Sequence, residues 1–287
     1  MTNLEAPGAD GPGPLLAGKV AVITGGAGSI GAATAQLFAE HGAQVVIADI
    51  DADRSDATVE SIRAAGGDAR SVASDVRIQA DVDRLCEAVL ADYGRVDVLV
   101  NNAGHFVRQA RGFLDEDPEL WEELYKVNLL HVFTVTRAFL PSMLERGAGS
   151  IINVSSVEGL RGYPAGIVYG AFKAAVVQFT RSLGVQVANQ GVRVNGIGPD
   201  VTDALQVPYD SLVPADQWHL WPLWVPIGRV GVGRDQARVL LFLASDLSAF
   251  VTGHTIPTDG GTSSAGGWFR SERRAGGTGW TNRPIDP

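Results

Sequence analysis

A strand, a glycine-rich turn, a helix and a second strand follow one another within the first fifty residues. Residues 19–24 form a short β-branched run, residues 25–31 read Gly-Gly-Ala-Gly-Ser-Ile-Gly, residues 32–41 have helical periodicity, and residues 44–49 read as a buried strand. This order is that of a βαβ unit that binds a dinucleotide, with the pyrophosphate at the helix N-terminus. Glycines let the backbone approach a phosphate closely. The turn therefore predicts a cofactor site at Gly25, Gly28, Ser29, Ile30 and Gly31.

Asp49 ends the second strand, eighteen residues after Gly31. A carboxylate there can accept hydrogen bonds from both hydroxyls of an adenosine ribose, and it would repel a 2′-phosphate. Ile50 and Asp51 follow it, so no basic residue comes next in the chain. We therefore expect NAD, with Asp49 and Ile50 in the adenosine site. A solvated loop acid is the alternative, and Arg54 in the next helix is the main observation against NAD.

The pattern of strand and helix then repeats to the end of the chain. Apolar runs predict strands at residues 69–74, 96–100, 150–154, 192–197 and 255–258. Helical periodicity predicts helices at residues 78–93, 119–145 (with a break near Pro141), 169–189 and 234–245. Alternating elements of these lengths without a linker predict a single α/β domain: a Rossmann-type, doubly wound parallel sheet with helices on both faces.

Composition excludes several classes of function. The chain has 287 residues and a net charge of −9 without a basic run, so nucleic acid and anionic membranes are poor partners. A single cysteine, Cys86, suits a reducing compartment. Residues 1–17 lack a signal-peptide pattern, and no apolar run approaches the roughly 20 residues of a membrane helix. We expect a cytoplasmic enzyme, and the absence of His, Cys and Asp at ligand spacing predicts no catalytic metal.

A second cluster of chemistry lies between Ser156 and Lys173. Tyr169 and Lys173 are four residues apart and share one helix face. Ser156 follows the apolar run that ends at Val154, so a hydroxyl at a strand end, a phenol and an ammonium can converge. Such a set can move a proton to or from an alcohol oxygen. Strand alternation points only one of Ser155 and Ser156 into the site, and the residues alone leave both open.

Taken together, residues 17–262 resemble the NAD(P)-dependent short-chain dehydrogenase/reductase family. The motifs that match in order are the Thr24-to-Gly31 turn, Asp75, Asn101-Asn102-Ala103-Gly104, Asn128, Ser156, Tyr169, Lys173 and Asp259-Gly260-Gly261. The resemblance implies that Ser156, Tyr169 and Lys173 are catalytic, with Asn128 holding a water in a proton relay. It further implies cofactor contacts by Asp75, Val76, Asn102, Ala103, Gly104, Tyr169, Lys173, Pro199 and Thr202, and a homotetramer.

In this family Tyr169 would be the general base of oxidation and the general acid of reduction. A free phenol titrates near ~10, and Lys173 with an oxidised nicotinamide would favour phenolate. Lowering its pKa by about three units needs roughly 4 kcal/mol. The chain departs from the family pattern at Ser29, which we expect to cap the helix and donate to phosphate, and at Asp200 and Ala204, which replace a glycine and a threonine.

The segment 203–228 occupies the usual position of a substrate lid. Three of the six tryptophans, Trp218, Trp221 and Trp224, fall within it and predict a substrate contact, although packing within the lid or at a subunit interface is an equal alternative. The sequence thus predicts an NAD-linked oxidoreductase of a bulky, hydrophobic secondary alcohol or ketone, such as a steroid, terpenoid or aromatic.

A 3-oxoacyl-thioester reductase and a non-catalytic NAD-binding regulatory protein stay as alternatives. His105, Glu158 and Arg161 flank the site in sequence, and we expect them to be surface or rim residues. Residues 1–16 are expected to be a disordered leader. Residues 263–287 extend past the usual end of the family, and their aromatic content predicts that they pack on the body or on a neighbouring subunit.

Overall fold

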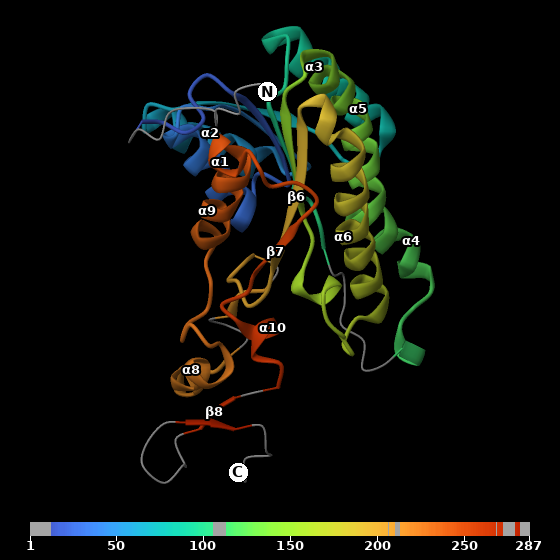
Figure 1. The fold of residues 1–287 in the computed structure, drawn as a ribbon. Coiled ribbons are helices and arrows are strands. Elements are labelled where there is room, and N and C mark those ends of the chain that lie inside the picture. The colour runs from blue at the N-terminus through green and yellow to red at the C-terminus, as the bar shows by residue number, and fades with distance from the viewer. Residues whose placement is uncertain are drawn as a thin grey trace, which may run out of the picture.

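Seven parallel strands form one sheet at the centre of the protein (Figure 1). The computed structural model describes residues 13–105, 113–205, 207–209, 213–267, 269–271 and 279–281. The strand order is β3-β2-β1-β4-β5-β6-β7, so the order reverses between β1 and β4. In sheets of this kind ligands bind outside the carboxyl ends of the strands at such a reversal. The strands are β1 (Val20–Thr24), β2 (Gln44–Asp49), β3 (Asp68–Ala73), β4 (Val98–Asn101), β5 (Gly149–Val154), β6 (Val192–Pro199) and β7 (Thr255–Thr258).

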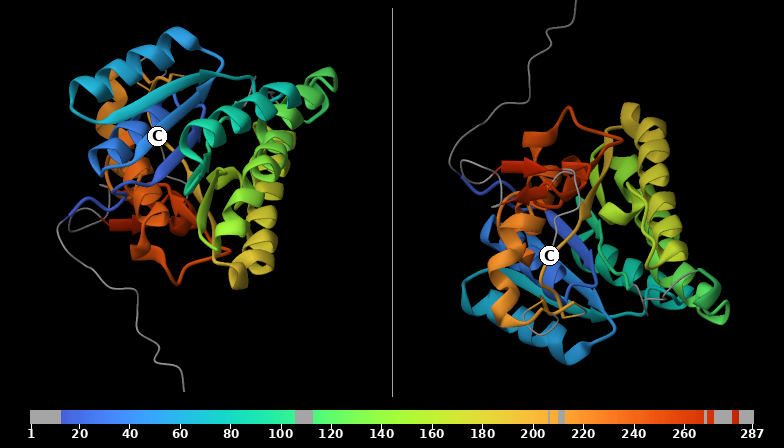
Figure 2. Two further views of the ribbon diagram at one scale, coloured as in Figure 1. Left: turned by 90° about the horizontal axis from the view of Figure 1, so that it is seen from above. Right: turned by 90° about the horizontal axis from the view of Figure 1, so that it is seen from below.

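Helices cover both faces of the sheet, which confirms the predicted doubly wound α/β fold (Figures 1 and 2). One face carries α1 (Ser29–Glu40), α2 (Ala52–Ala64) and α9 (Gly233–Ala244). The other face carries α3 (Gln79–Tyr93), α4 (Glu119–Tyr125), α5 (His131–Arg146) and α6 (Ile167–Val187). The strand register sets Thr24 beside Ala48 on one side and Asn101 on the other, so the ends of β1, β2 and β4 are level.

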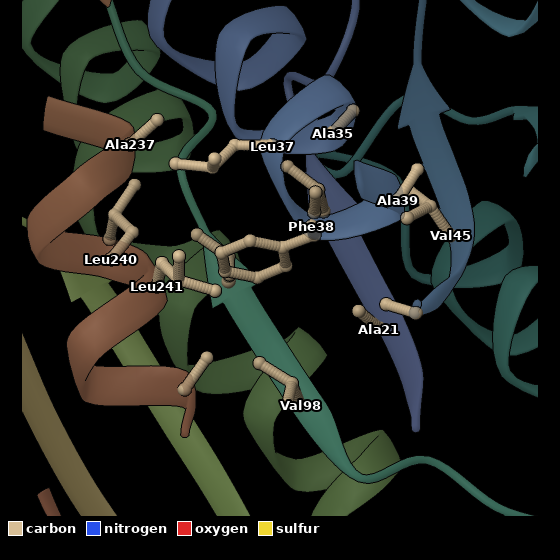
Figure 3. Close-up of a cluster of buried hydrophobic side chains, with 14 of the residues drawn as sticks. Ala21, Ala35, Leu37, Phe38, Ala39, Val45, Val98, Ala237, Leu240 and Leu241 are labelled. Carbon is tan, nitrogen blue, oxygen red and sulfur yellow. The ribbon is translucent and has the colours of Figure 1, made fainter. Parts of the chain in front are cut away.

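Phe38 lies at the centre of the core on the first face. Figure 3 shows its ring among Leu240 and Leu241 of α9 and Val98 of β4. Burying a side chain of this size contributes about 1.5–3 kcal/mol. Leu16 is fully buried in the same cluster and its N–H donates to the His41 carbonyl at 2.9 Å. The leader predicted for residues 1–16 therefore reaches too far, and residues 1–12 lie outside the described part of the chain.

The helix predicted for residues 119–145 runs from Glu119 to Arg146. The expected break at Pro141 is wrong, because Pro141 lies inside α5. The irregularity comes earlier, where Lys126–Leu130 forms a π-helical turn around Asn128. Such turns often occur at functional sites. In length and composition this helix alone, among the described residues, is apolar enough to span a membrane, and its residues Phe139 and Met143 are buried against the sheet as in a core helix.

The last part of the chain lies at the end of the sheet where the strands terminate (Figure 1). The lid segment contains the short helix α8 (Trp221–Trp224), and α10 (Thr262–Ala265) follows β7. The strands β8 (Phe269–Ser271) and β9 (Gly279–Thr281) form an antiparallel pair, and β8 contacts α8. Part of the extension thus lies against the lid. Trp268 lies outside the described residues, and packing on a neighbouring subunit stays a prediction.

Candidate active site

A cleft of about 590 Å³ opens where the carboxyl ends of the central strands meet. Its walls come from the turn after β1, the end of β2, the segment after β4, and the ends of β5 and β6. Most of the residues expected from the sequence line it. These are Gly25, Gly28, Ser29, Ile30, Asp49, Ile50, Asp75, Val76, Asn102, Ala103, Gly104, Ser156, Tyr169, Lys173, Pro199 and Thr202.

The glycine-rich turn brings the start of α1 to the cleft. Gly28 is the N-cap, and among the described residues no side chain caps this helix, so its first N–H groups are open to an anion. A Cβ at Gly28 would meet only the Leu205 side chain of the lid, at 3.9 Å. Gly31 does not line the cleft. A Cβ there would lie 2.1 Å from the Gly25 carbonyl oxygen, so this glycine permits the turn to pack on the helix.

Ser29 differs from its predicted role as a helix cap. Its hydroxyl accepts a hydrogen bond from the Leu205 N–H at 2.9 Å and so ties the lid to the start of α1. Thr202 lines the cleft, and its buried hydroxyl accepts from the Gln236 amide at 2.8 Å, so its expected contact with the cofactor stays a prediction. The Ser29 contact arises because the lid folds back on the glycine turn, which sequence spacing does not show.

Asp49 is held in place by the turn that it faces. One carboxylate oxygen accepts from the Ala27 N–H and the other from the Asp51 N–H, both at 3.0 Å. Arg54 also lines the cleft, and its guanidinium lies 3.2 Å from the Asp51 carboxylate. In the stretch from Asp49 to Arg54, two carboxylates, those of Asp49 and Asp51, and one guanidinium therefore line this end of the cleft.

Asp75 forms a second ion pair on the same side of the cleft. Its carboxylate accepts from the Arg77 guanidinium at 2.8 and 2.9 Å, and this hydrogen bond lowers the pKa of Asp75. Arg77 lies 3.7 Å from Glu123 as well. Sequence reasoning did not single out Arg77, because the single residue between it and Asp75 gives no sign of which side chain turns toward the cleft.

Ser156, Tyr169 and Lys173 converge as predicted. Ser156 is the second residue after β5, and its hydroxyl hydrogen-bonds the Tyr169 phenol. The Lys173 ammonium lies 5.6 Å from the centre of the Tyr169 ring. In the protein without cofactor, Ser155 is not available as the reactive hydroxyl, because it is buried and donates to the Lys173 carbonyl at 2.8 Å.

Asn128 supports the site from behind the cleft wall. Its side-chain amide donates to the His105 carbonyl at 2.6 Å and to the Leu124 carbonyl at 3.1 Å, and its oxygen accepts from the His105 N–H. The Lys173 ammonium donates to the Val154 carbonyl at 3.2 Å. A Cβ at Gly104 would lie 3.1 Å from that ammonium and 3.3 Å from the Asn128 oxygen. Gly104 therefore makes room for both side chains.

Burial controls the titration of the two reactive groups. It lowers the pKa of Lys173 to about 8, so the ammonium stays charged at neutral pH. It raises the pKa of Tyr169 to about 12, which the hydrogen bond from Ser156 lowers and the charge of Glu158 raises further. The sequence argument expected a lowered phenol pKa. In the protein alone desolvation has the larger effect, so phenolate needs additional positive charge in the cleft.

The three lid tryptophans do not line the cleft. Trp224 is 70% exposed, Trp218 donates its indole N–H to the Val213 carbonyl at 2.9 Å, and Trp221 packs edge-on against Tyr209 at 5.5 Å. Trp218 and Trp221 thus pack within the lid, the alternative that the sequence left open, while Trp224 faces solvent. Tyr163, Tyr209, Glu158 and Asp200 line the cleft beside Tyr169 instead. Sequence spacing pointed to the aromatic content of the lid but not to which rings face inward.

Comparison with known proteins identifies the family. A family model described as enoyl-(acyl carrier protein) reductase matches residues 25–263. A solved structure of a putative short-chain dehydrogenase/reductase from Burkholderia xenovorans superposes with a TM-score of 0.79 at 38% identity, covering 88% of this chain and 98% of that one. The chain belongs to the short-chain dehydrogenase/reductase family. It is therefore an oxidoreductase that acts on an alcohol or ketone group with a nicotinamide cofactor.

Relatives within this family act on different substrates. The chain is 38% identical to a 3-oxoacyl-[acyl-carrier-protein] reductase, FabG, of Thermotoga maritima, over 86% of this chain and 98% of the relative. It is 39% identical to 2,5-dichloro-2,5-cyclohexadiene-1,4-diol dehydrogenase, LinX, of Sphingobium indicum, over 86% of this chain and 97% of the relative. Similarity at this level gives the class of reaction and leaves the substrate open.

Proposed function

We propose that the protein is an NAD(H)-linked dehydrogenase of a bulky, cyclic secondary alcohol or the matching ketone. The observation that carries the cofactor choice is the position of Asp49. Its carboxylate lines the cleft at the end of β2, held by the N–H groups of Ala27 and Asp51, where a 2′-phosphate would meet like charge.

The glycine turn, Asp49 and the residues after β4 fit a dinucleotide. The start of α1 offers open N–H groups for pyrophosphate, and Asn102 fixes the turn by donating to the Gly25 carbonyl at 2.9 Å. When bound, NAD(H) supplies the hydride acceptor or donor. The family pattern assigns Pro199 and Thr202 to the nicotinamide end, where Pro199 lines the cleft beside Ser156.

The chain's own residues then handle the substrate oxygen and its proton. The Ser156 hydroxyl holds the substrate oxygen, and the Tyr169 phenol takes the proton in oxidation or gives it in reduction. Lys173 keeps a positive charge beside the phenol and favours its ionised form. Asn128, through its grip on the His105 backbone, keeps the loop that covers Lys173 in place.

Two features of the cleft support a ring as substrate. Tyr163 and Tyr209 bring aromatic surface to the wall beside Tyr169, and Leu205 and Val207 add apolar surface from the lid. Rigid aromatic walls suit flat or puckered rings, which bind by area and shape. The relative LinX acts on a cyclohexadiene diol, which agrees with this class.

The test is turnover of cyclic secondary alcohols with NAD⁺ and NADP⁺ in parallel. We expect NAD⁺ to be preferred and Tyr169→Phe to be inactive. Asp49→Asn should weaken use of NAD⁺ by about tenfold or more, since a hydrogen bond to a charged group is worth about 1.5–3 kcal/mol. Asp53→Asn removes the same charge from an exposed position on α2 and serves as the control. A preference of the wild type for NADP⁺ would contradict the cofactor assignment.

A 3-oxoacyl-thioester reductase linked to NADPH is the second candidate. The 38% identity to FabG favours it, as do Arg54 and Arg77 at the adenosine end of the cleft. Both guanidinium groups face carboxylates, those of Asp51 and Asp75, which reduces the charge left for a 2′-phosphate. Reduction of an acetoacetyl thioester with NADPH at a higher kcat/KM than any cyclic ketone would establish this candidate instead.

A further inference from the structure

Two carboxylates and one guanidinium meet at the substrate end of the cleft. Glu158 and Asp200 both line it, and each side chain is 12% exposed. One nitrogen of Arg161 donates to the Glu158 carboxylate at 2.9 Å and to the Asp200 carboxylate at 3.1 Å. We call these three residues the carboxylate clamp. The sequence suggested surface or rim residues for Glu158 and Arg161, and this placement corrects that expectation for Glu158.

Three distant parts of the chain fix the carboxylate clamp. Glu158 and Arg161 come from the loop between β5 and α6, and Asp200 directly follows β6. The Thr262 hydroxyl of α10 donates to the same Asp200 oxygen that faces Arg161. Because an ion pair, a hydroxyl and two strand ends hold these groups, their position is set before a substrate arrives.

The carboxylate clamp lies beside the reacting groups. The Glu158 N–H donates to the Ser156 hydroxyl at 3.2 Å, so the carboxylate is two residues from the group that holds the substrate oxygen. Burial is the main cause of the raised pKa of Tyr169 and of Tyr209; the charge of Glu158 adds to it at Tyr169, and the charges of Asp200 and Glu158 add to it at Tyr209. The negative potential of the clamp thus reaches the tyrosine of the reaction and a tyrosine of the lid.

The carboxylate clamp carries excess negative charge and a spare acceptor. Two carboxylates face one guanidinium, and Arg161 divides its bonds between them. Within the described residues the second oxygen of Asp200, Oδ1, accepts no hydrogen bond. A carboxylate oxygen is an acceptor only, so a neutral hydroxyl can satisfy it, whereas an anionic group would be repelled.

We propose that the carboxylate clamp binds a second hydroxyl of a neutral cyclic diol and selects against ring acids and other anionic substrates. The clamp determines specificity and takes no part in proton or hydride transfer. This inference rests on the proposed function, since it assigns the substrate class of the same cleft. It distinguishes a diol from the 3-oxoacyl thioester of the second candidate function, which has no second hydroxyl to donate.

The experiment compares kcat/KM at saturating NAD⁺ for the isomeric cyclohexanediols, cyclohexanol and 4-hydroxycyclohexanecarboxylate. We expect the best diol to exceed cyclohexanol by about tenfold, which corresponds to about 1.4 kcal/mol. The acid should be slower than cyclohexanol. Asp200→Asn should bring the diol advantage down to about twofold and raise the acid relative to cyclohexanol by about tenfold. Asp216→Asn, which removes a charge from an exposed lid position outside the cleft, should change neither ratio.

Because both ratios are taken within one enzyme preparation, a partly unfolded variant does not distort them. Calorimetric titration of the NADH complex of Tyr169→Phe with diol and with cyclohexanol measures recognition without turnover. Absence of all turnover would sink the proposed reaction, and this titration would still decide the carboxylate clamp. The inference is overturned if cyclohexanol binds as tightly as every diol, if Asp200→Asn leaves the ratios unchanged, or if 4-aminocyclohexanol is preferred to the diols.

Discussion

Replacing Lys173 with methionine tests how the protein makes a tyrosine into a base. The ammonium lies 5.6 Å from the centre of the Tyr169 ring. With the phenolate charge placed at the ring centre and an effective dielectric constant of about 20, the ammonium favours phenolate by about 3 kcal/mol, or about two pKa units. In the protein without cofactor the pKa of Tyr169 is about 12, chiefly because the phenol is buried, so the attraction of nearby positive charge is what can bring it toward neutrality. In Lys173→Met the rising limb of alcohol oxidation should move about two pH units toward alkaline values.

The assay is the pH profile of kcat for NAD⁺ reduction, with cofactor and alcohol saturating so that weaker binding does not enter. Lys19→Met is the matched control. It removes a lysine that pairs with Asp246, and neither residue lines the cleft. If kcat of Lys173→Met rises over the same pH range as in the wild type but reaches a lower maximum, the electrostatic role is refuted. Lys173 would then act by holding the cofactor or a water in position.

The other predictions concern stability and the lid. Because burial lowers the pKa of Lys173 from 10.5 to about 8, the folded protein binds fewer protons than the unfolded chain between those values. Lys173→Met should therefore raise the free energy of unfolding by about 3 kcal/mol at pH 7, measured by urea denaturation, and lose this advantage above pH 10.5. Gly31→Ala should prevent stable folding, since its Cβ would lie 2.1 Å from the Gly25 oxygen, whereas Gly162→Ala, with nothing within 4 Å, should melt like the wild type. Ser29→Ala removes the acceptor of the Leu205 N–H and should speed hydrogen exchange of this N–H by about tenfold. Unchanged exchange would contradict the tie between lid and turn.

The sheet and the glycine turn were predictable because short-range rules determine them. The apolar runs that end at Thr24, Asp49 and Val154 form strands with those ends. Buried parallel strands need continuous apolar residues, and a strand followed by glycines and a helix admits few folds. For the same reason the carboxyl ends of these strands could be expected to share one cleft.

The lid could not be predicted to the same depth. Trp218, Trp221 and Trp224 are close in sequence and suggest one apolar wall, yet the rings pack on the lid itself or face solvent. Which side of a Pro-rich segment faces a cleft depends on where its ends attach. Here Ser29 holds one end of the lid through the Leu205 N–H, a bond between residues 176 positions apart. No local pattern encodes such a contact.

Titration of the reactive groups was also beyond the sequence, because it depends on how deeply each group is buried. Lys173 and Gly104 appear in the sequence as parts of separate motifs, 69 positions apart. In the structure a methyl group at position 104 would lie 3.1 Å from the ammonium and 3.3 Å from the Asn128 oxygen. The absence of a side chain at Gly104 is therefore what allows the ammonium to reach the Val154 carbonyl beside Tyr169. Burying this charge lowers the stability of the fold at neutral pH, but moving Lys173 toward water would weaken its attraction for the phenolate. Gly104, Asn128 and Lys173 thus act together to hold a charged group away from solvent at the point where the proton is exchanged.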